Sequence, residues 1–470
     1  MRECLQFSIG GRWVEPESLE TLDVENPATE QVVGQVALGS TADVDRAVQA
    51  AKTAFRTWSR TSRDERLEVL DRIQAEYRNR FHDLVAAVTE EMGAPTSLAK
   101  NAHVPSGLGH FASAAEILRD FAFQETRGDT VIIKEPIGVC SLITPWNWPL
   151  NQIVCKVAPA IATGCTMVLK PSEVAPFSGH IFAEIMQAAG VPAGVFNLVH
   201  GDGPGAGVAL SSHPDVDMVS FTGSTRAGIE VARNAAPTVK RVHQELGGKS
   251  PHIILDDDSF AARVARGVRS VMSNSGQSCN APTRMLVPAA RMTEANAVAR
   301  AAAEQLTVGD PVGGADLGPV VSHTQWHKIQ GLIKEGVGEG ASLVAGGPDR
   351  PAGLERGYYV RPTVFGDVTN DMTVAREEIF GPVLTILGYD SLDQAIEISN
   401  DTDYGLSAYV SGADPTQART VAARLQAGQV SINLAASSTA PFGGYKMSGN
   451  GREGGESAFY EFLETKAVIG

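Results

Sequence analysis

The feature that most constrains how this chain can fold is a series of short apolar runs in which polar and apolar residues do not alternate. Such runs are typical of strands that are buried on both faces of a sheet. Segments with helical spacing separate them, the clearest at residues 177–189, which fits right-handed βαβ units. The sequence therefore predicts a parallel α/β sheet of the kind that binds nucleotides, with strands at residues 139–144, 167–170, 195–199 and 218–221.

A second α/β unit is predicted to begin near Val242. The glycine-rich stretch 331–347 and the segment 358–365 indicate loops and short strands on its rim. Its expected strands are residues 252–255, 283–288 and 429–433, and its expected helices are residues 263–272, 294–306, 392–400 and 416–425.

Further elements flank these two units. The tail, residues 461–469, has the pattern of a strand but no expected partner nearby, which favours pairing with another subunit. The other expected elements are a hairpin at residues 7–14, strands at 31–37 and 130–135, and helices at 41–58, 62–92 and 111–123.

Charge and cysteine content argue against several classes of function. The formal net charge is −15 and no Lys/Arg-rich run is present, so neither nucleic acid nor an anionic membrane surface is the expected partner. The five cysteines are an odd number without a CxxC pair or a nearby histidine, so we expect neither a disulfide framework nor a metal site. No run approaches the roughly 18 apolar residues of a membrane span. We therefore expect a cytoplasmic protein.

Cys279 is the strongest candidate for a reactive side chain. Asn274 and Gly276 break the helical pattern just before it, so the thiol is expected on a loop or at a new helix start. Backbone N–H groups in such a place favour a thiolate and can hold an oxyanion. The alternative is that Cys279 is a small buried hydrophobic residue, the usual fate of a free cysteine.

Two further residues gain meaning beside this cysteine. Asn147 lies in the rigid aromatic corner PWNWP at a predicted strand end, where its amide could face a developing negative charge. Glu245 precedes two glycines and, in an apolar cleft, could act as a general base on water. Taken alone, Asn147 could merely cap a turn and Glu245 could be a surface residue.

Several segments could hold a nucleotide. Lys170 and Glu173 follow a predicted strand and could bind the hydroxyls of an adenosine ribose, or form a solvated ion pair. Two glycine-rich stretches, residues 201–206 and 221–228, each follow a strand, and either could be a mere turn. In the second, Ser224 and the start of a helix could hold a pyrophosphate.

Seven motifs taken together resemble the NAD(P)-dependent aldehyde dehydrogenase superfamily. They occur in the order of that family, and the likeness extends from the N-terminal GGRW and NPATE segments to the C-terminal strand. The resemblance implies two Rossmann-like parallel-sheet domains and a small β oligomerisation element. The motifs are PWNWP, KPSE, FTGSTRAG, ELGGKSP, GQSCNAPTR, EEIFGPV and PFGGYKMSGNGRE.

The resemblance also implies a role for individual residues. Cys279 would attack the aldehyde, Asn147 and the Cys279 N–H would hold the oxyanion, and Glu245 would activate the water that hydrolyses the thioester. Residues 221–228 would be the phosphate loop, and the pattern at Gly201 would not. The implied cofactor contacts are Ile143, Trp146, Lys170, Ser172, Glu173, Gly223, Ser224, Glu378 and Phe380, and the implied substrate-tunnel residues are Trp148, Gln152, Ser278, Asn280 and Phe442.

Cofactor, branch and assembly follow from the same resemblance. Glu173 favours NAD, although Lys170 beside it could tolerate NADP. Glu245 favours the hydrolytic branch over the CoA-acylating branch, and the intact Cys279, Glu245 and Asn147 argue against a non-catalytic binding or structural member. The chain is expected to form a dimer or tetramer. The expected domains are residues 1–122 with 136–245 for NAD binding, 246–440 for catalysis, and 123–135 with 441–470 for oligomerisation.

The expected tunnel lining is small and polar rather than aromatic. It includes Asn151, Cys155, Ser273 and Ala436 besides the residues already named, and it contains no arginine. The lining predicts a roomy tunnel for a polar aldehyde, such as a catabolic semialdehyde or a substituted aromatic aldehyde. The absence of an arginine argues against a dicarboxylic semialdehyde. Arg284 is expected to be structural.

Overall fold

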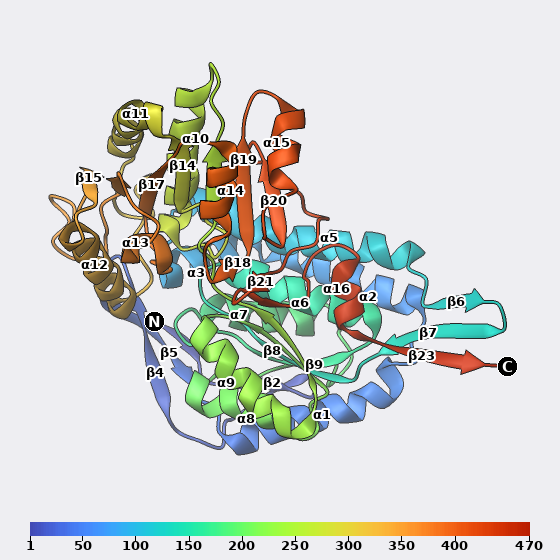
Figure 1. Cartoon of the computed structure of the whole chain (residues 1–470). Coiled ribbons are helices and arrows are strands. Elements are labelled where there is room, and N and C mark those ends of the chain that lie inside the picture. Colours follow the sequence, from blue (N-terminus) through green and yellow to red (C-terminus); the bar gives the residue numbers. More distant parts are fainter.

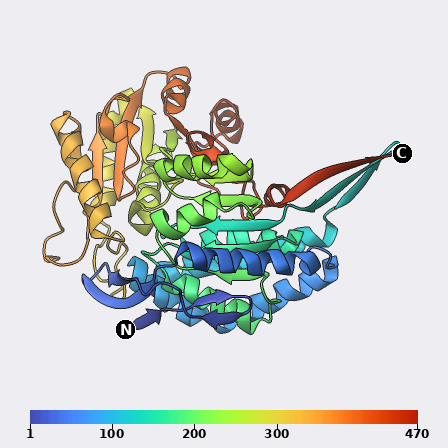
Figure 2. The same ribbon diagram turned by 90° about the horizontal axis from the view of Figure 1, so that it is seen from below.

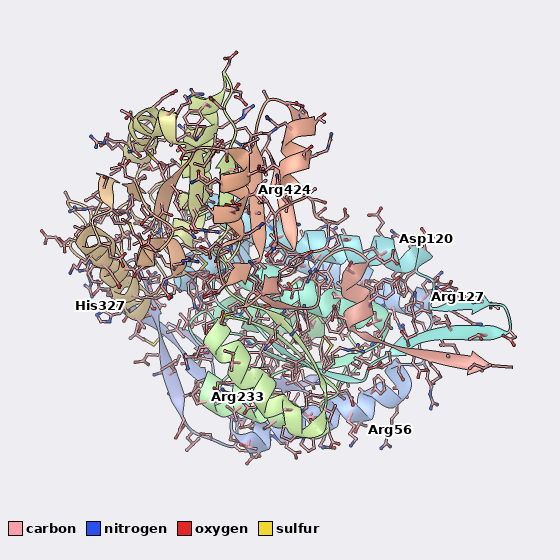
Figure 3. All side chains as sticks on the ribbon, in the orientation of Figure 1. Arg56, Asp120, Arg127, Arg233, His327 and Arg424 are labelled. Atoms are coloured by element: carbon pink, nitrogen blue, oxygen red, sulfur yellow. The ribbon has the colours of Figure 1, made fainter.

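Two large and mostly parallel sheets organise the chain, and the predicted α/β class is confirmed (Figure 1). The computed structural model describes residues 1–470. No helix in it combines the length and the apolar character that crossing a membrane requires. Charged side chains such as Arg56, Asp120 and Arg233 lie at the periphery of the molecule (Figure 3).

The first sheet has eight strands, of which the central five are parallel. From β8 the chain continues through β9 and β10 in one direction, and then returns to add β11 and β12 on the other side. This reversal opens a crevice between the carboxyl ends of β8 and β11, where open α/β sheets bind ligands. In spatial order the strands are β22 (Gly449–Asn450), β12 (Arg241–Glu245), β11 (Met218–Thr222), β8 (Val139–Ile143), β9 (Thr166–Lys170), β10 (Phe196–Leu198), β2 (Phe7–Ile9) and β3 (Arg12–Val14).

Both faces of this sheet are covered, which explains the apolar runs. Cys140 and Leu142 face one buried cluster, whereas their neighbours Val139 and Ile143 face another. Helices α1 and α2 begin with serine capping boxes that satisfy their first N–H groups. The helices of this half are α1 (Thr41–Trp58), α2 (Arg63–Asn79), α3 (Phe81–Met92), α4 (Thr96–Leu98), η1 (Ala99–His103), α5 (Val104–Asp120), α6 (Pro149–Thr163), α7 (Phe177–Ala188), η2 (Gly203–Gly207), α8 (Val208–Ser212), α9 (Thr225–Ala235) and η3 (Ala236–Thr238).

The second sheet has seven strands, all parallel except the edge strand β15. Its order is β15 (Ser342–Ala345), β16 (Thr363–Gly366), β17 (Val383–Tyr389), β14 (Arg284–Pro288), β13 (Pro251–Ile254), β19 (Ser407–Ser411) and β20 (Gln429–Ile432). Two buried clusters again cover its two faces. Its helices are α10 (Phe260–Met272), η4 (Ser273–Gly276), η5 (Ala289–Arg291), α11 (Met292–Glu304), α12 (His323–Gly338), α13 (Thr373–Arg376), α14 (Leu392–Asn400) and α15 (Pro415–Ala422). Helix α16 (Ser457–Glu461) instead packs on α6 of the first half, near the C-terminal arm.

Three small sheets complete the fold, and one forms an arm that projects from the body with the C-terminus at its tip (Figure 2). In this arm the tail strand pairs antiparallel with β7, so the prediction that the tail lacks a partner in its own chain was wrong. The sheets are β1 (Arg2–Cys4), β5 (Gln31–Ala37) and β4 (Thr21–Asn26); β18 (Tyr404–Gly405) and β21 (Tyr445–Lys446); and the arm of β23 (Leu463–Ile469), β7 (Thr130–Pro136) and β6 (Gln124–Arg127).

Three expected elements differ from the structure. The single helix expected at 62–92 is two helices that meet at Arg80. The helix expected at 111–123 begins seven residues earlier, at Val104, and ends at Asp120. The glycine-rich stretch from residue 331 continues helix α12 to Gly338, because buried residues such as Ile329 and Ile333 anchor that helix on the second sheet. The limits of the domains stay a prediction. Within residues 441–470, β22 pairs with β12 of the first sheet, whereas β23 belongs to the arm.

Candidate active site

An unusual turn places Cys279 at the wall of the largest cavity described, about 720 Å³ in volume. Helix α10 ends at Met272, and the next residues Asn274, Ser275 and Gly276 all have positive φ. Gly276 is required here, because a Cβ on it would lie 1.9 Å from the carbonyl oxygen of Gly381. The left-handed turn therefore ends the helix and brings the thiol to the cavity.

Hydrogen-bond donors surround the thiol. The backbone N–H of Cys279 has no acceptor within the chain. The buried Asn147 amide donates to the carbonyl of Gln277 over 3.1 Å, which leaves its second N–H free. Asn274 holds Asn147 in place by donating to its carbonyl over 3.0 Å. This arrangement can stabilise negative charge that develops on an atom bound by the cysteine.

The surroundings of Cys279 favour the protonated thiol over the thiolate. Burial raises its pKa above the ordinary value, and the nearby carboxyl groups of Glu378, Glu245 and Glu453 raise it further. The N–H of Asn280 has the opposite, smaller effect. Deprotonation of the thiol therefore needs a base or a positive charge in the site.

Glu245 ends strand β12, buried beside the cavity but not among its lining residues. Neither of its carboxyl oxygens has a hydrogen-bond partner, and the nearest basic nitrogen, His243 Nε2, is 3.5 Å away. Burial and the charge of Glu453 hold the pKa of Glu245 well above its ordinary value. A carboxylate in this state is basic enough to accept a proton from water.

A buried ion pair that the sequence did not reveal lies next to Glu245. Burial alone would raise the pKa of Glu453, but the ammonium group of Lys156 contacts it and holds the pKa below its ordinary value. Glu453 also accepts from the Cys155 thiol at 3.3 Å and lines the cavity. It lies in the PFGGYKMSGNGRE motif, but only the fold brings it to Lys156 on α6.

Two helices form one side of the cavity wall, each through one stripe of side chains. On α6, Asn151, Gln152 and Cys155 follow Trp148 at helical spacing, and α5 presents a matching stripe that ends at His110. Four of the five predicted tunnel residues line the cavity; Ser278 instead accepts from the Trp148 indole over 2.8 Å. Lining residues that the sequence did not indicate are Asn101, Ser106, His110, Tyr409, Gln429 and Glu453.

Several predicted cofactor residues meet at the crevice between β8 and β11. Ile143 is buried at the end of β8, Gly223 follows β11, and Ser224 caps the start of α9. The hydroxyl groups of Thr144 and Thr222, one beside each strand end, are buried without a hydrogen-bond partner. Unsatisfied donors at this crevice fit a polar ligand such as a dinucleotide.

The remaining predicted cofactor residues lie on either side of the crevice. Lys170 and Glu173 form an ion pair at 3.2 Å, and Lys170 also donates to the Gly201 carbonyl. Ser172 lies buried between them and accepts from a backbone N–H in its own turn. In the alternative glycine-rich stretch, Asp202 occupies the N–H of Gly205, so that loop satisfies its own donors.

Residues of both sheets meet at the other end of the crevice. The rings of Trp146 and Phe380 pack edge to face with centroids 5.5 Å apart. Glu378 accepts from the N–H of Gly248 over 2.9 Å, and burial raises the pKa of its carboxyl group. These contacts join the loop that follows β8 and the segment at residues 245–248 to the loop around Phe380.

The comparisons with known proteins agree with this arrangement. Residues 13–468 match the model described as the aldehyde dehydrogenase family. The chain belongs to the aldehyde dehydrogenase family. The resemblance that the motifs predicted is thus confirmed, over nearly the whole length of the chain.

Full-length relatives of this aldehyde dehydrogenase include a 3-succinoylsemialdehyde-pyridine dehydrogenase from a Pseudomonas species, 55% identical over all of this chain and 99% of its own. A cysteine-to-alanine mutant of aldehyde dehydrogenase C from Pseudomonas syringae, solved with NAD+ and octanal, is 53% identical. Its TM-score is 0.98, over 99% of this chain and 96% of that one. A Mycobacterium tuberculosis aldehyde dehydrogenase solved with NAD+ is 39% identical, with a TM-score of 0.97 over 99% and 98% of the two chains.

Proposed function

We propose that this chain uses NAD+ and water to oxidise an aldehyde to a carboxylic acid, with Cys279 as the nucleophile. The observation that carries the proposal is the position of the Cys279 thiol at the wall of a large cavity. The backbone N–H of Cys279 has no acceptor, and the side-chain amide of Asn147 has one N–H that makes no hydrogen bond. The family shown by the sequence and the NAD+ bound by two of its solved relatives support it.

The first step forms a bond between Cys279 sulfur and the aldehyde carbon, while the thiol proton passes to water in the cavity and from there to solvent. The carbonyl oxygen becomes an oxyanion, which accepts hydrogen bonds from the Cys279 N–H and the free N–H of Asn147. Loss of hydride from that carbon leaves a thioester on Cys279, and NAD+ supplies the hydride acceptor when it is bound.

In the second step water cleaves the thioester. Glu245 accepts a proton as the water oxygen bonds to the acyl carbon, and the sulfur leaves as a thiolate. The raised pKa of Glu245 suits this role, and a rotation of its side chain towards the cavity would bring it to the water. The ion pair of Lys156 and Glu453 lies near Glu245, with Glu453 at the cavity wall.

The residues of the crevice support NAD+ rather than NADP+. The Glu173 carboxylate is partly exposed and held beside Lys170, where it would accept from ribose hydroxyls and repel a 2′-phosphate. Ser224 and the start of α9 would face the pyrophosphate, and Glu378 the nicotinamide ribose. We expect Glu173→Gln to narrow the preference for NAD+ over NADP+.

The proposed reaction is tested by following NADH absorbance with an aldehyde in the absence of CoA. Cys279→Ala should abolish NADH formation, and Glu245→Gln should release one NADH per chain and then stall with a thioester that intact-mass measurement detects. Dependence on added CoA would instead favour an acyl-CoA-forming enzyme. Activity that persists in Cys279→Ala would refute the assignment, and a wild-type chain that binds NAD+ but oxidises no aldehyde would favour a binding protein.

For the substrate we propose a polar or ring-bearing aldehyde or semialdehyde. The cavity is large enough for a substituted aromatic group, and its walls carry polar atoms that include the unpartnered Oε1 of Gln152. His110 bonds to Asn151 at 2.8 Å and burial lowers its pKa, so its ring is neutral. A relative named for a pyridine semialdehyde supports this class.

An apolar aldehyde is the alternative, because a solved relative holds octanal. We expect kcat/KM to be higher for heteroaromatic and hydroxylated aldehydes than for hexanal or octanal. His110→Leu should lower kcat/KM for the polar aldehydes by about tenfold, the value of one hydrogen bond, and leave octanal unchanged. Faster turnover of hexanal than of any polar aldehyde would contradict the proposal.

We further propose that the arm joins copies of this chain into a dimer or tetramer. Strand β23 lies at the edge of the arm, and its residues after Leu463 are exposed, including Ile469 at 76%. An exposed apolar edge strand favours pairing with another chain. Light scattering should give a multiple of 49.6 kDa, and Val468→Lys should lower that mass. A monomeric wild-type chain would refute this assembly.

A further inference from the structure

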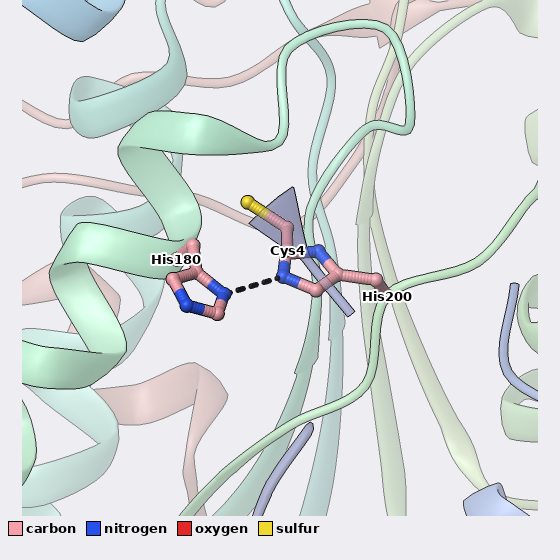
Figure 4. Close-up of side chains that lie close together, drawn as sticks. All are labelled: Cys4, His180 and His200. Atoms are coloured by element: carbon pink, nitrogen blue, oxygen red, sulfur yellow. Dashed lines mark hydrogen bonds between the residues drawn. The ribbon is translucent and has the colours of Figure 1, made fainter. Parts of the chain in front are cut away.

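We propose that Cys4, His180 and His200 form a binding site for Zn²⁺ or a similar thiophilic divalent ion, separate from the cavity of Cys279. The three residues come from β1, α7 and the turn after β10, and their ligand atoms all lie within 4.8 Å of one another. Figure 4 shows the cysteine beside the two imidazole rings. No spacing in the sequence brings these residues together.

The distances suit a tetrahedral ion. His180 Nδ1 and His200 Nε2 are 3.3 Å apart. Two ligands at about 2.0 to 2.3 Å from a tetrahedral Zn²⁺ are themselves about 3.3 to 3.8 Å apart. The nitrogens are already at this separation, so only the sulfur has to approach, and the partly exposed face of His180 leaves the fourth position open to water.

Hydrogen bonding within the protein does not satisfy this cluster. Cys4 is a free thiol that is only 3% exposed, and its sulfur makes no hydrogen bond. Buried polar atoms without partners are uncommon and point to a missing ligand. The only bond within the cluster is the proton shared between the two imidazoles.

The chemistry of the three groups favours a metal over a proton. Two imidazoles and a thiolate are ligands that Zn²⁺ prefers. The ion must displace the Cys4 thiol proton to solvent, so binding will tighten as pH rises. The imidazole that donates the hydrogen bond between the two rings must then hold its proton on its other nitrogen, so that both facing nitrogens can bind the ion.

Nearby charges do not oppose the ion. Glu91 and Glu184 lie close enough to raise the pKa of Cys4, and the same negative potential favours a divalent cation. The neighbouring cation Arg2 is already paired with Glu90 at 2.7 Å. Lys170, which lowers the pKa of His200, is paired with Glu173.

Supporting contacts orient the ligands. Trp13 stacks on the His180 ring with centroids 4.5 Å apart, and the His200 carbonyl accepts from the N–H of Gly39 over 2.9 Å. Bound metal would fasten the N-terminal strand to α7 and β10. Because Gly201 next to His200 receives the Lys170 ammonium, the ion would also steady the ribose end of the proposed cofactor crevice.

The test uses the full chain carrying Cys279→Ala and His327→Gln. These changes remove two competing metal sites. Cys279→Ala removes the thiol at the cavity, and His327→Gln breaks the exposed pair of His323 and His327 on α12, whose nitrogens are 2.9 Å apart. His327 lies on the outside of the molecule (Figure 3). Titration with Co²⁺ should give one ion per chain, with tetrahedral visible bands and a thiolate-to-cobalt charge-transfer band, and Zn²⁺ should displace it.

Adding Cys4→Ser should abolish the charge-transfer band and weaken Zn²⁺ binding by at least about 100-fold. Adding His180→Gln, at a partly exposed position, should weaken binding similarly, and Cys165→Ser, at another buried thiol, should leave it unchanged. Circular dichroism checks that each variant is folded. A charge-transfer band that survives Cys4→Ser, or the absence of a saturable site in the folded parent, would overturn the proposal.

Discussion

Replacing Gly276 with alanine tests how the turn before Cys279 positions the thiol. The glycine has φ +72°, and a Cβ there would lie 1.9 Å from the Gly381 carbonyl oxygen, whereas such contacts are not closer than 3.0 Å in real structures. One segment must retreat by the difference, about 1.1 Å. A catalytic group displaced by about 1 Å loses about 100-fold in rate. The left-handed backbone adds about 1 to 2 kcal/mol of strain.

We therefore expect Gly276→Ala to lower kcat/KM by about 100-fold, measured by NADH formation, and to lower the free energy of unfolding by at least about 1 kcal/mol. Gly331→Ala is the matched control, because Gly331 is exposed in α12 with nothing within 4 Å of an added Cβ. That change should raise stability by up to about 1 kcal/mol and leave activity unchanged. Normal kcat/KM in folded Gly276→Ala would refute the assignment of the turn.

Three other substitutions give distinct expectations. Asn147→Ala should lower kcat by about 100- to 1,000-fold with little change in KM, because we propose that its amide holds the oxyanion; a rise in KM alone would contradict that role. Arg284→Met should lower the free energy of unfolding by about 3 to 5 kcal/mol in denaturant titration, since the buried guanidinium donates to Lys249, Asn370, Ile398 and Ser399. Burial raises the pKa of the Glu91 carboxyl group to about 7. The free energy of unfolding that its protonation contributes should therefore be fully present below about pH 4.5 and decline towards pH 7. Glu91→Gln should flatten that part of the plot of stability against pH.

Local signals were enough to predict most elements. The strands that were predicted and helices such as α1 and α14 lie within a few residues of their expected ranges, because two-sided burial and helical periodicity are visible in short windows. The central strands β17 and β19 of the second sheet were not predicted. The turn at Asn274 and Gly276 was also visible as a break before Cys279. The extension of α12 through its glycines was missed, because packing of Ile329 and Ile333 outweighs the low helix propensity of glycine there.

The family, the α/β fold and the position of the candidate nucleophile Cys279 in the chain are therefore determined by the sequence itself, where each depends on adjacent residues. The walls of the cavity, the contact of Lys156 with Glu453, and the grouping of Cys4 with two distant histidines were decided only by the tertiary structure. The pairing of the tail with β7 belongs with them. Each of these joins residues far apart in the chain, and such contacts depend on how whole elements pack, which no local pattern of residues encodes.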